Sequence, residues 1–79
     1  MKTIQFVVEA KRYFDVDAER LAEVKDGDLV LVTLDMENKK ASYIWYQDGE
    51  NPANFPEEED DFEAVLEKFR EEVETQLGE

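Results

Sequence analysis

The sequence predicts a single α+β domain over residues 1–79, in which a three-stranded antiparallel sheet with the order β-α-β-β-α carries a long acidic C-terminal helix on one face. Three observations predict this fold. Hydrophobic residues make up 42% of the chain and 11% of all residues are aromatic, which is enough for one small core. Two extended apolar runs flank a polar turn in the middle of the chain. Apolar residues then recur at helical spacing near the C-terminus.

The first two elements are a strand over residues 3–10 and a short helix that follows it. Apolar and polar side chains alternate along the strand, which is typical of a strand with one buried face. Asp17 is suited to the N-cap of the helix, and Val16 and Leu21 have the spacing of a hydrophobic staple. Gly27 suits the position just past the helix, where a left-handed backbone is common. We therefore expect a helix of about nine residues, which is too short to be stable without tertiary contacts.

The strongest strand signals lie in residues 28–35 and 40–47. The first run has apolar side chains at both alternating sets of positions, which indicates a central strand. The polar residues between the runs include Asn38, which tolerates the left-handed backbone of a tight turn. We expect the two strands to pair as an antiparallel hairpin, and the turn-rich stretch 48–52 to end the sheet.

The last element is expected to be a helix of roughly twenty residues that begins near Pro56. Proline fits the first helical turn, and the acidic run 57–61 suits the positive end of the helix dipole. Its apolar residues follow the spacing i, i+3, i+4, i+7, i+11 and i+15, and they are Phe62, Val65, Leu66, Phe69, Val73 and Leu77. This stripe would bury one side of the helix against the sheet, and Gly78 would end the helix.

The net charge of −13 is concentrated in the last third of the chain. Residues 1–46 contain nine acidic and seven basic residues, whereas residues 47–79 contain thirteen acidic residues against only Lys68 and Arg70. Such an asymmetry indicates either an acidic tail or a folded face that binds something basic. Direct binding to nucleic acid or to an anionic membrane is disfavoured, because both would be repelled.

An acidic surface on the last helix is the candidate partner-binding site. Its residues are Glu57, Glu58, Glu59, Asp60, Asp61, Glu63, Glu67, Glu71 and Glu74. On one straight helix, the members from Asp60 onward would form a row roughly 21 Å long. Like charges three or four residues apart destabilise a helix by a few tenths of a kcal/mol per pair, about as much as opposite charges stabilise it. Selection for stability alone would therefore place lysines at several of these positions.

A rigid row of anions has the charge pattern that basic nucleic-acid-binding grooves receive. In size, charge and acidic helix, the chain resembles the small acidic inhibitors of phages and mobile elements. These include anti-CRISPR, anti-restriction and glycosylase-inhibitor proteins, several of which are DNA mimics. The resemblance implies a non-enzymatic inhibitor that blocks a basic nucleic-acid-binding site on a target protein. It would act as a monomer or homodimer in the cytoplasm, that of the host cell if a phage encodes it. The alternative is a solvated helix face whose acidity serves solubility alone.

A second function class is a protein–protein adaptor, or an antitoxin or immunity module. It would bind through a sheet edge or through exposed aromatic residues, of which Tyr43 and Tyr46 are the secondary candidates. The simpler interpretation places these rings in the core under the long helix.

Catalysis is the least expected function class. The chain contains no cysteine and no histidine, which removes thiolate metal sites, the commonest general base and the commonest zinc ligand. Each of the three glycines is explained by a turn or a helix end, so no phosphate-binding loop is present. We expect no catalytic residue, no cofactor and no metal site.

Overall fold

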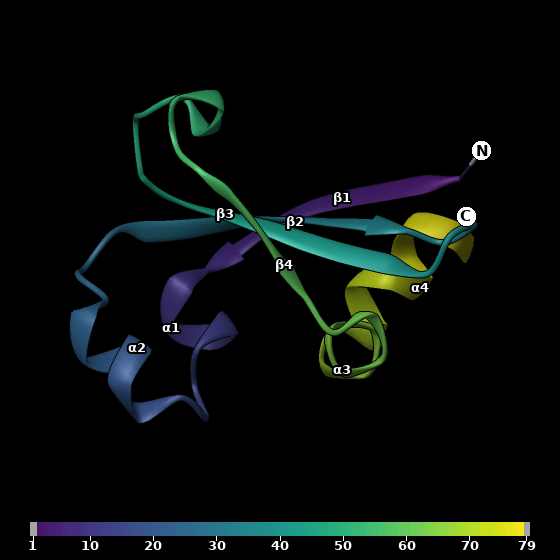
Figure 1. Ribbon diagram of the computed structural model, residues 1–79, viewed down its shortest axis with the longest axis horizontal. Coiled ribbons are helices and arrows are strands. Elements are labelled where there is room, and N and C mark those ends of the chain that lie inside the picture. Colours follow the sequence, from purple (N-terminus) through teal and green to yellow (C-terminus); the bar gives the residue numbers. More distant parts are fainter. Residues whose placement is uncertain (1, 79) are drawn as a thin grey trace.

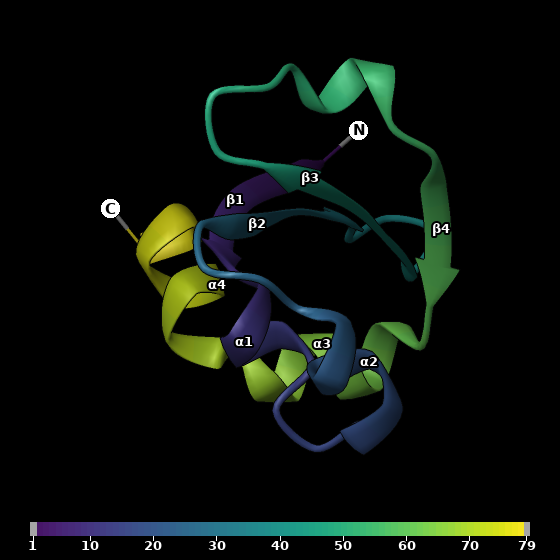
Figure 2. The ribbon, with the colours of Figure 1, turned by 90° about the vertical axis from the view of Figure 1, so that its left-hand side faces the viewer.

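The computed structural model describes residues 2–78 and contains a four-stranded antiparallel sheet with the order β1-β2-β3-β4 (Figure 1). The strands are β1 (Thr3–Glu9), β2 (Asp28–Asp35), β3 (Lys40–Gln47) and β4 (Glu57–Asp60). The helices are α1 (Ala10–Tyr13), α2 (Ala18–Glu23), α3 (Phe62–Lys68) and α4 (Arg70–Gly78), with a 3₁₀ turn η1 (Pro52–Asn54) before β4. The four α-helices lie on one face of the sheet, and the loop with η1 rises from the other side (Figures 1 and 2). No described helix is long and apolar enough to cross a membrane.

The central hairpin confirms the predicted strands 28–35 and 40–47 at both of their boundaries. In the turn between them, Lys39 rather than Asn38 adopts the left-handed backbone, with φ 57°. Asn38 instead donates a 2.9 Å side-chain hydrogen bond to Asp35, and its backbone N–H bonds to the same carboxylate. The side chain that suited the left-handed position is thus used to close the turn.

The short helix α2 begins as its N-cap predicts. Asp17 accepts a hydrogen bond of 3.2 Å from the backbone N–H of Arg20. The helix is shorter than the nine residues expected: it ends at Glu23, so Gly27, with a φ of 91°, lies in the turn before β2 and not just past the helix. The predicted hydrophobic staple is wrong, because Val16 is 90% exposed and Leu21 is 37% exposed. The segment before α2 follows the helix α1 instead of an extended chain, so Val16 projects into solvent.

The sheet has an inner face toward the helices and an outer face away from them, because successive side chains of a strand alternate. The register places three cross-strand rows on the inner face: Ile4, Leu34 and Ala41; Phe6, Val32 and Tyr43; Val8, Val30 and Trp45. These side chains are the sheet's part of the core. On β4 the same alternation turns Glu58 and Asp60 toward the inner face and Glu57 and Glu59 toward the outer face.

Phe69 lies at the centre of the core and is fully buried. Its ring centroid is 5.7 Å from that of Phe6 on β1 and 5.6 Å from that of Tyr13 on α1. Phe62, Val65 and Val73 are also buried, as the helical spacing predicts, whereas Leu66 is only half-buried.

The predicted three-stranded sheet with one long C-terminal helix is wrong in two respects. First, the acidic run after Pro56 forms the fourth strand, β4, and not a first helical turn. Second, the helix is broken at Phe69, whose φ of −114° and ψ of 36° separate α3 from α4. A straight helix of twenty residues would be about 30 Å long, close to the longest dimension of the whole molecule, 32 Å. The break lets buried side chains of both helices reach the same small core.

Candidate functional site

Four consecutive carboxylates occupy β4, the edge strand of the sheet. All four are exposed, and the strand pairs only with β3 among the described residues. In Figure 2, β4 runs along the outside of the molecule with no element beyond it. The chain continues through Asp61 into α3, where Glu63 is exposed as well. We call Glu57–Asp61 together with Glu63 the acidic edge.

Hydrogen bonds from the rest of the fold hold the acidic edge in place. The hydroxyl of Tyr13 donates to Asp60 over 2.6 Å, and the hydroxyl of Ser42 donates to Glu57 over 2.7 Å. Burial raises the pKa of Tyr13 well above its ordinary value, and the bond to Asp60 raises this pKa further, so Tyr13 remains a donor at any physiological pH. Asp61 caps α3 by accepting from the backbone N–H of Glu63.

The remaining candidate residues do not lie on one straight row. Glu67 is on α3, whereas Glu71 and Glu74 are on α4 beyond the break at Phe69. The predicted 21 Å row is therefore wrong as a single helix face, because its members belong to a strand and two differently directed helices (Figure 1). Glu67 also forms an ion pair with Arg70, which neutralises it locally.

Most of the candidate carboxylates form no ion pair within the described residues. All nine are exposed, and within the described residues only Glu67 has a Lys or Arg nitrogen within 4.0 Å. The other three ion pairs of the described residues involve carboxylates outside the candidate set: Lys11 pairs with Asp26, Arg12 with Glu72, and Lys68 with Asp15. Three of the four ion pairs among the described residues thus involve acids outside the candidate set, and none involves the acidic edge.

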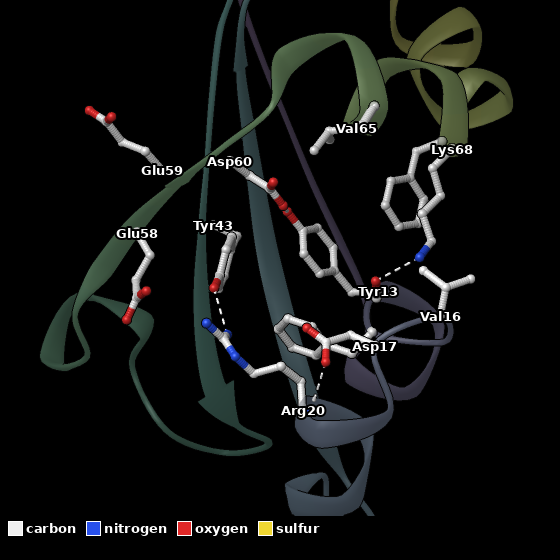
Figure 3. A pocket seen from close by; sticks show the side chains of 13 residues that line it. Tyr13, Val16, Asp17, Arg20, Tyr43, Glu58, Glu59, Asp60, Val65 and Lys68 are labelled. Carbon is white, nitrogen blue, oxygen red and sulfur yellow. Dashed lines mark hydrogen bonds between the residues drawn. The ribbon is translucent and has the colours of Figure 1, made fainter.

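A pocket of about 380 Å³ lies between β4, α3 and the segment that leads into α2 (Figure 3). Tyr13, Tyr43 and Val65 contribute to its apolar wall. Arg20 crosses it and donates a 2.8 Å hydrogen bond to the hydroxyl of Tyr43. Lys68 closes the opposite side, where its ammonium group donates to the carbonyl oxygen of Tyr13 over 2.7 Å. Side chains of both signs of charge line the pocket.

The secondary candidates Tyr43 and Tyr46 are buried, with 6% and 8% of their surfaces exposed. Neither ring is available as an exposed anchor. Tyr43 belongs to the core, as that interpretation predicts, whereas Tyr46 pairs with Leu29 on the outer face of the sheet and lies outside the core cluster. Sequence reasoning missed the residues that position the acidic edge, which are Tyr13 and Ser42. No spacing pattern relates either of them to β4, because the contacts come from the fold.

Within residues 2–78, no group of three or more Asp or Glu side chains is arranged to hold a metal ion. No protein-family model, curated protein or solved structure matches the chain.

Proposed function

We propose that this protein is a non-enzymatic inhibitor whose acidic edge occupies a basic nucleic-acid-binding site on a target protein. One observation carries the proposal: within the described residues, all nine candidate carboxylates are exposed and only Glu67 forms an ion pair, whereas Lys11, Arg12 and Lys68 pair with acids outside this set. An acidic surface that served only stability would place lysines beside its carboxylates.

The strand geometry of β4 supports charge mimicry better than the predicted helix did. Residues of a strand advance by about 3.3–3.4 Å, and the phosphates of one DNA strand are spaced by about 3.4 Å along the helix axis. The backbone positions of Glu57 to Asp60 therefore advance by about one phosphate step per residue, with the carboxylates alternating between the two faces of the sheet. Because β4 is an edge strand, side chains on both of its faces can reach a partner from the same side.

The acidic edge is kept rigid against its own repulsion. Four adjacent carboxylates favour an extended, solvated chain, yet β4 is paired with β3 in a defined register. The bonds from Tyr13 and Ser42 anchor the two ends of the strand, at Asp60 and Glu57. Side chains that are already held in place lose less conformational entropy when the partner binds, which favours affinity.

The proposal is tested with a target captured from lysate at low salt, released by a salt step, identified and purified. Binding is then measured for two doubly substituted variants with the same change in net charge. Glu59→Lys with Glu63→Lys reverses charge on the acidic edge, whereas Glu19→Lys with Glu23→Lys does so on α2. None of these four side chains forms a hydrogen bond or ion pair within the described residues.

The acidic-edge variant is expected to lose at least about tenfold in association rate, because electrostatic attraction acts mainly on encounter. The α2 variant should change by no more than about threefold, through its net charge alone. Wild-type protein should also compete with DNA for the target. Equal losses in the two variants, or simultaneous binding of DNA and the protein, would contradict charge mimicry by this surface.

A further inference from the structure

The outer face of the sheet carries an apolar row that none of the four α-helices covers, and the loop with η1 lies on the same side (Figures 1 and 2). Val7, Leu31 and Ile44 are direct cross-strand neighbours on β1, β2 and β3. Val7 is 50% exposed, and the other two are partly exposed and do not belong to the buried core cluster. These three side chains form one continuous apolar strip, which we call the outer strip.

One neighbouring row on the same face is polar, so strand propensity alone does not explain the outer strip, whereas the row on its other side contains Glu9, Leu29 and the buried Tyr46. The polar row contains Gln5, Thr33 and Ser42, and Gln5 donates a 3.1 Å hydrogen bond to the hydroxyl of Thr33. Threonine satisfies the preference of strands for β-branched side chains without exposing apolar surface. The sequence uses polar residues in one row and apolar residues in the next, which is the pattern of a contact surface.

The geometry of the outer strip suits an α-helix laid across the strands. Neighbouring strands are about 4.8 Å apart and a helix advances about 5.4 Å per turn, so one apolar residue per turn meets each of the three strands. The strip ends at β4, where Glu57 is the direct neighbour of Ile44 and Glu59 of Ser42. Both carboxylates project on the outer face and flank the end of such a helix.

The charges beside the outer strip indicate which kind of helix would bind there. A helix on the outer strip meets Glu57 and Glu59 at one margin, so basic side chains there would be complementary. A second copy of this chain would bring two net charges of −13 and two sets of these carboxylates together. We propose that the outer strip binds a basic amphipathic helix of the target, an inference that rests on the basic target of the proposed function and adds a second contact to it.

The probe is a synthetic 14-residue helical peptide of lysine, leucine and alanine, with one leucine per turn on a single face. A peptide of the same composition with its leucines distributed around the helix is the control. Binding to wild-type protein is followed by backbone amide chemical shifts in about 150 mM salt, where long-range attraction is screened. Sedimentation of the protein alone reports its oligomeric state.

The tested variant combines Val7→Thr with Ile44→Thr, which retains β-branched residues and every charge. Its matched control is Val16→Thr, at an exposed valine on the helix side of the molecule. Thermal melting establishes that each variant is folded. The peptide with one leucine face should shift the amides of the outer strip, bind the double variant about tenfold more weakly, and bind the Val16→Thr variant normally.

Equal binding of the two peptides would show attraction by charge alone and overturn the inference. Failure of both peptides to bind, or shifts centred on the helices, would overturn it as well. A wild-type dimer that the double variant converts to a monomer would assign the strip to a second copy and overturn the proposed occupant. The double variant keeps the acidic edge, so each of these results is independent of the charge-reversal test of the proposed function.

Discussion

The hydroxyl of Tyr13 donates a 2.6 Å hydrogen bond to the carboxylate of Asp60, and this bond joins segments that are 47 residues apart in the chain. Tyr13 is buried at the end of α1, and its ring stacks on Phe69. Asp60 is the last residue of β4. The core thereby fixes the end of a strand whose four residues have almost no apolar surface of their own to bury.

The substitution Tyr13→Phe is expected to loosen β4 while leaving the core packed. The ring remains, but the hydrogen bond to the carboxylate is lost, at a cost of about 1–2 kcal/mol in the free energy of unfolding. Urea denaturation measures this loss, and amide exchange should quicken at residues 57–60 more than at β2. Tyr46→Phe is the matched control, because the Tyr46 hydroxyl forms no hydrogen bond within the described residues. A uniform change in exchange across the sheet would show that Tyr13 supports the core as a whole.

The substitution Phe69→Ala should be the most destabilising single change in the C-terminal helices. Phe69 has 0% of its surface exposed, and its ring packs against the rings of Phe6 and Tyr13. Removing it leaves a cavity and costs about 3–5 kcal/mol, a large share of the stability of a small domain. Leu66→Ala should cost less, because Leu66 is only half-buried. Equal losses of stability in the two variants would contradict this placement of the core.

The central hairpin could be predicted because its pattern is local. Residues 28–47 contain two apolar runs and a polar turn, and these fix both strand boundaries. The extended conformation of residues 57–60 could not be predicted in the same way. Glutamate favours helices over strands, and only pairing with β3 and the bonds to Asp60 and Glu57 make this run extended. The break at Phe69 is likewise tertiary, since the apolar spacing continues through it without interruption.

The composition of the candidate site could be predicted, but its shape could not. All nine carboxylates are exposed, as their polarity alone suggests. Their division among β4, α3 and α4 depends on contacts distant in sequence. The outer strip had no sequence signal either, because Val7, Leu31 and Ile44 become neighbours only through the strand register.

Added salt should stabilise the protein. The net charge is −13, and the acidic edge contains adjacent carboxylates whose repulsion salt screens. The melting temperature should therefore rise as sodium chloride increases from about 10 mM to about 500 mM, over which the Debye length falls from about 30 Å to a few ångströms. The Glu59→Lys and Glu63→Lys variant should show a smaller rise. A melting temperature that falls with salt would indicate that the four ion pairs outweigh the repulsion.

The contact between Lys68 and Asp15 should give the stability a specific dependence on pH. The hydrogen bond from the Lys68 ammonium group lowers the pKa of Asp15 below its ordinary value of 3.8. The folded state therefore favours the ionised carboxylate, so the stabilisation is complete at pH values above 3.8 and disappears as the pH falls through the lower folded-state pKa. Asp15→Asn should accordingly reduce the free energy of unfolding at pH 7 and have progressively less effect in more acidic solution.

Urea denaturation of wild type and Asp15→Asn between pH 7 and pH 2 measures the difference in the free energy of unfolding. Asp48→Asn is the control, because Asp48 is an exposed carboxylate without an ion pair among the described residues. A difference between wild type and Asp15→Asn that stays constant over this range would show that the stabilisation does not come from the ionised carboxylate.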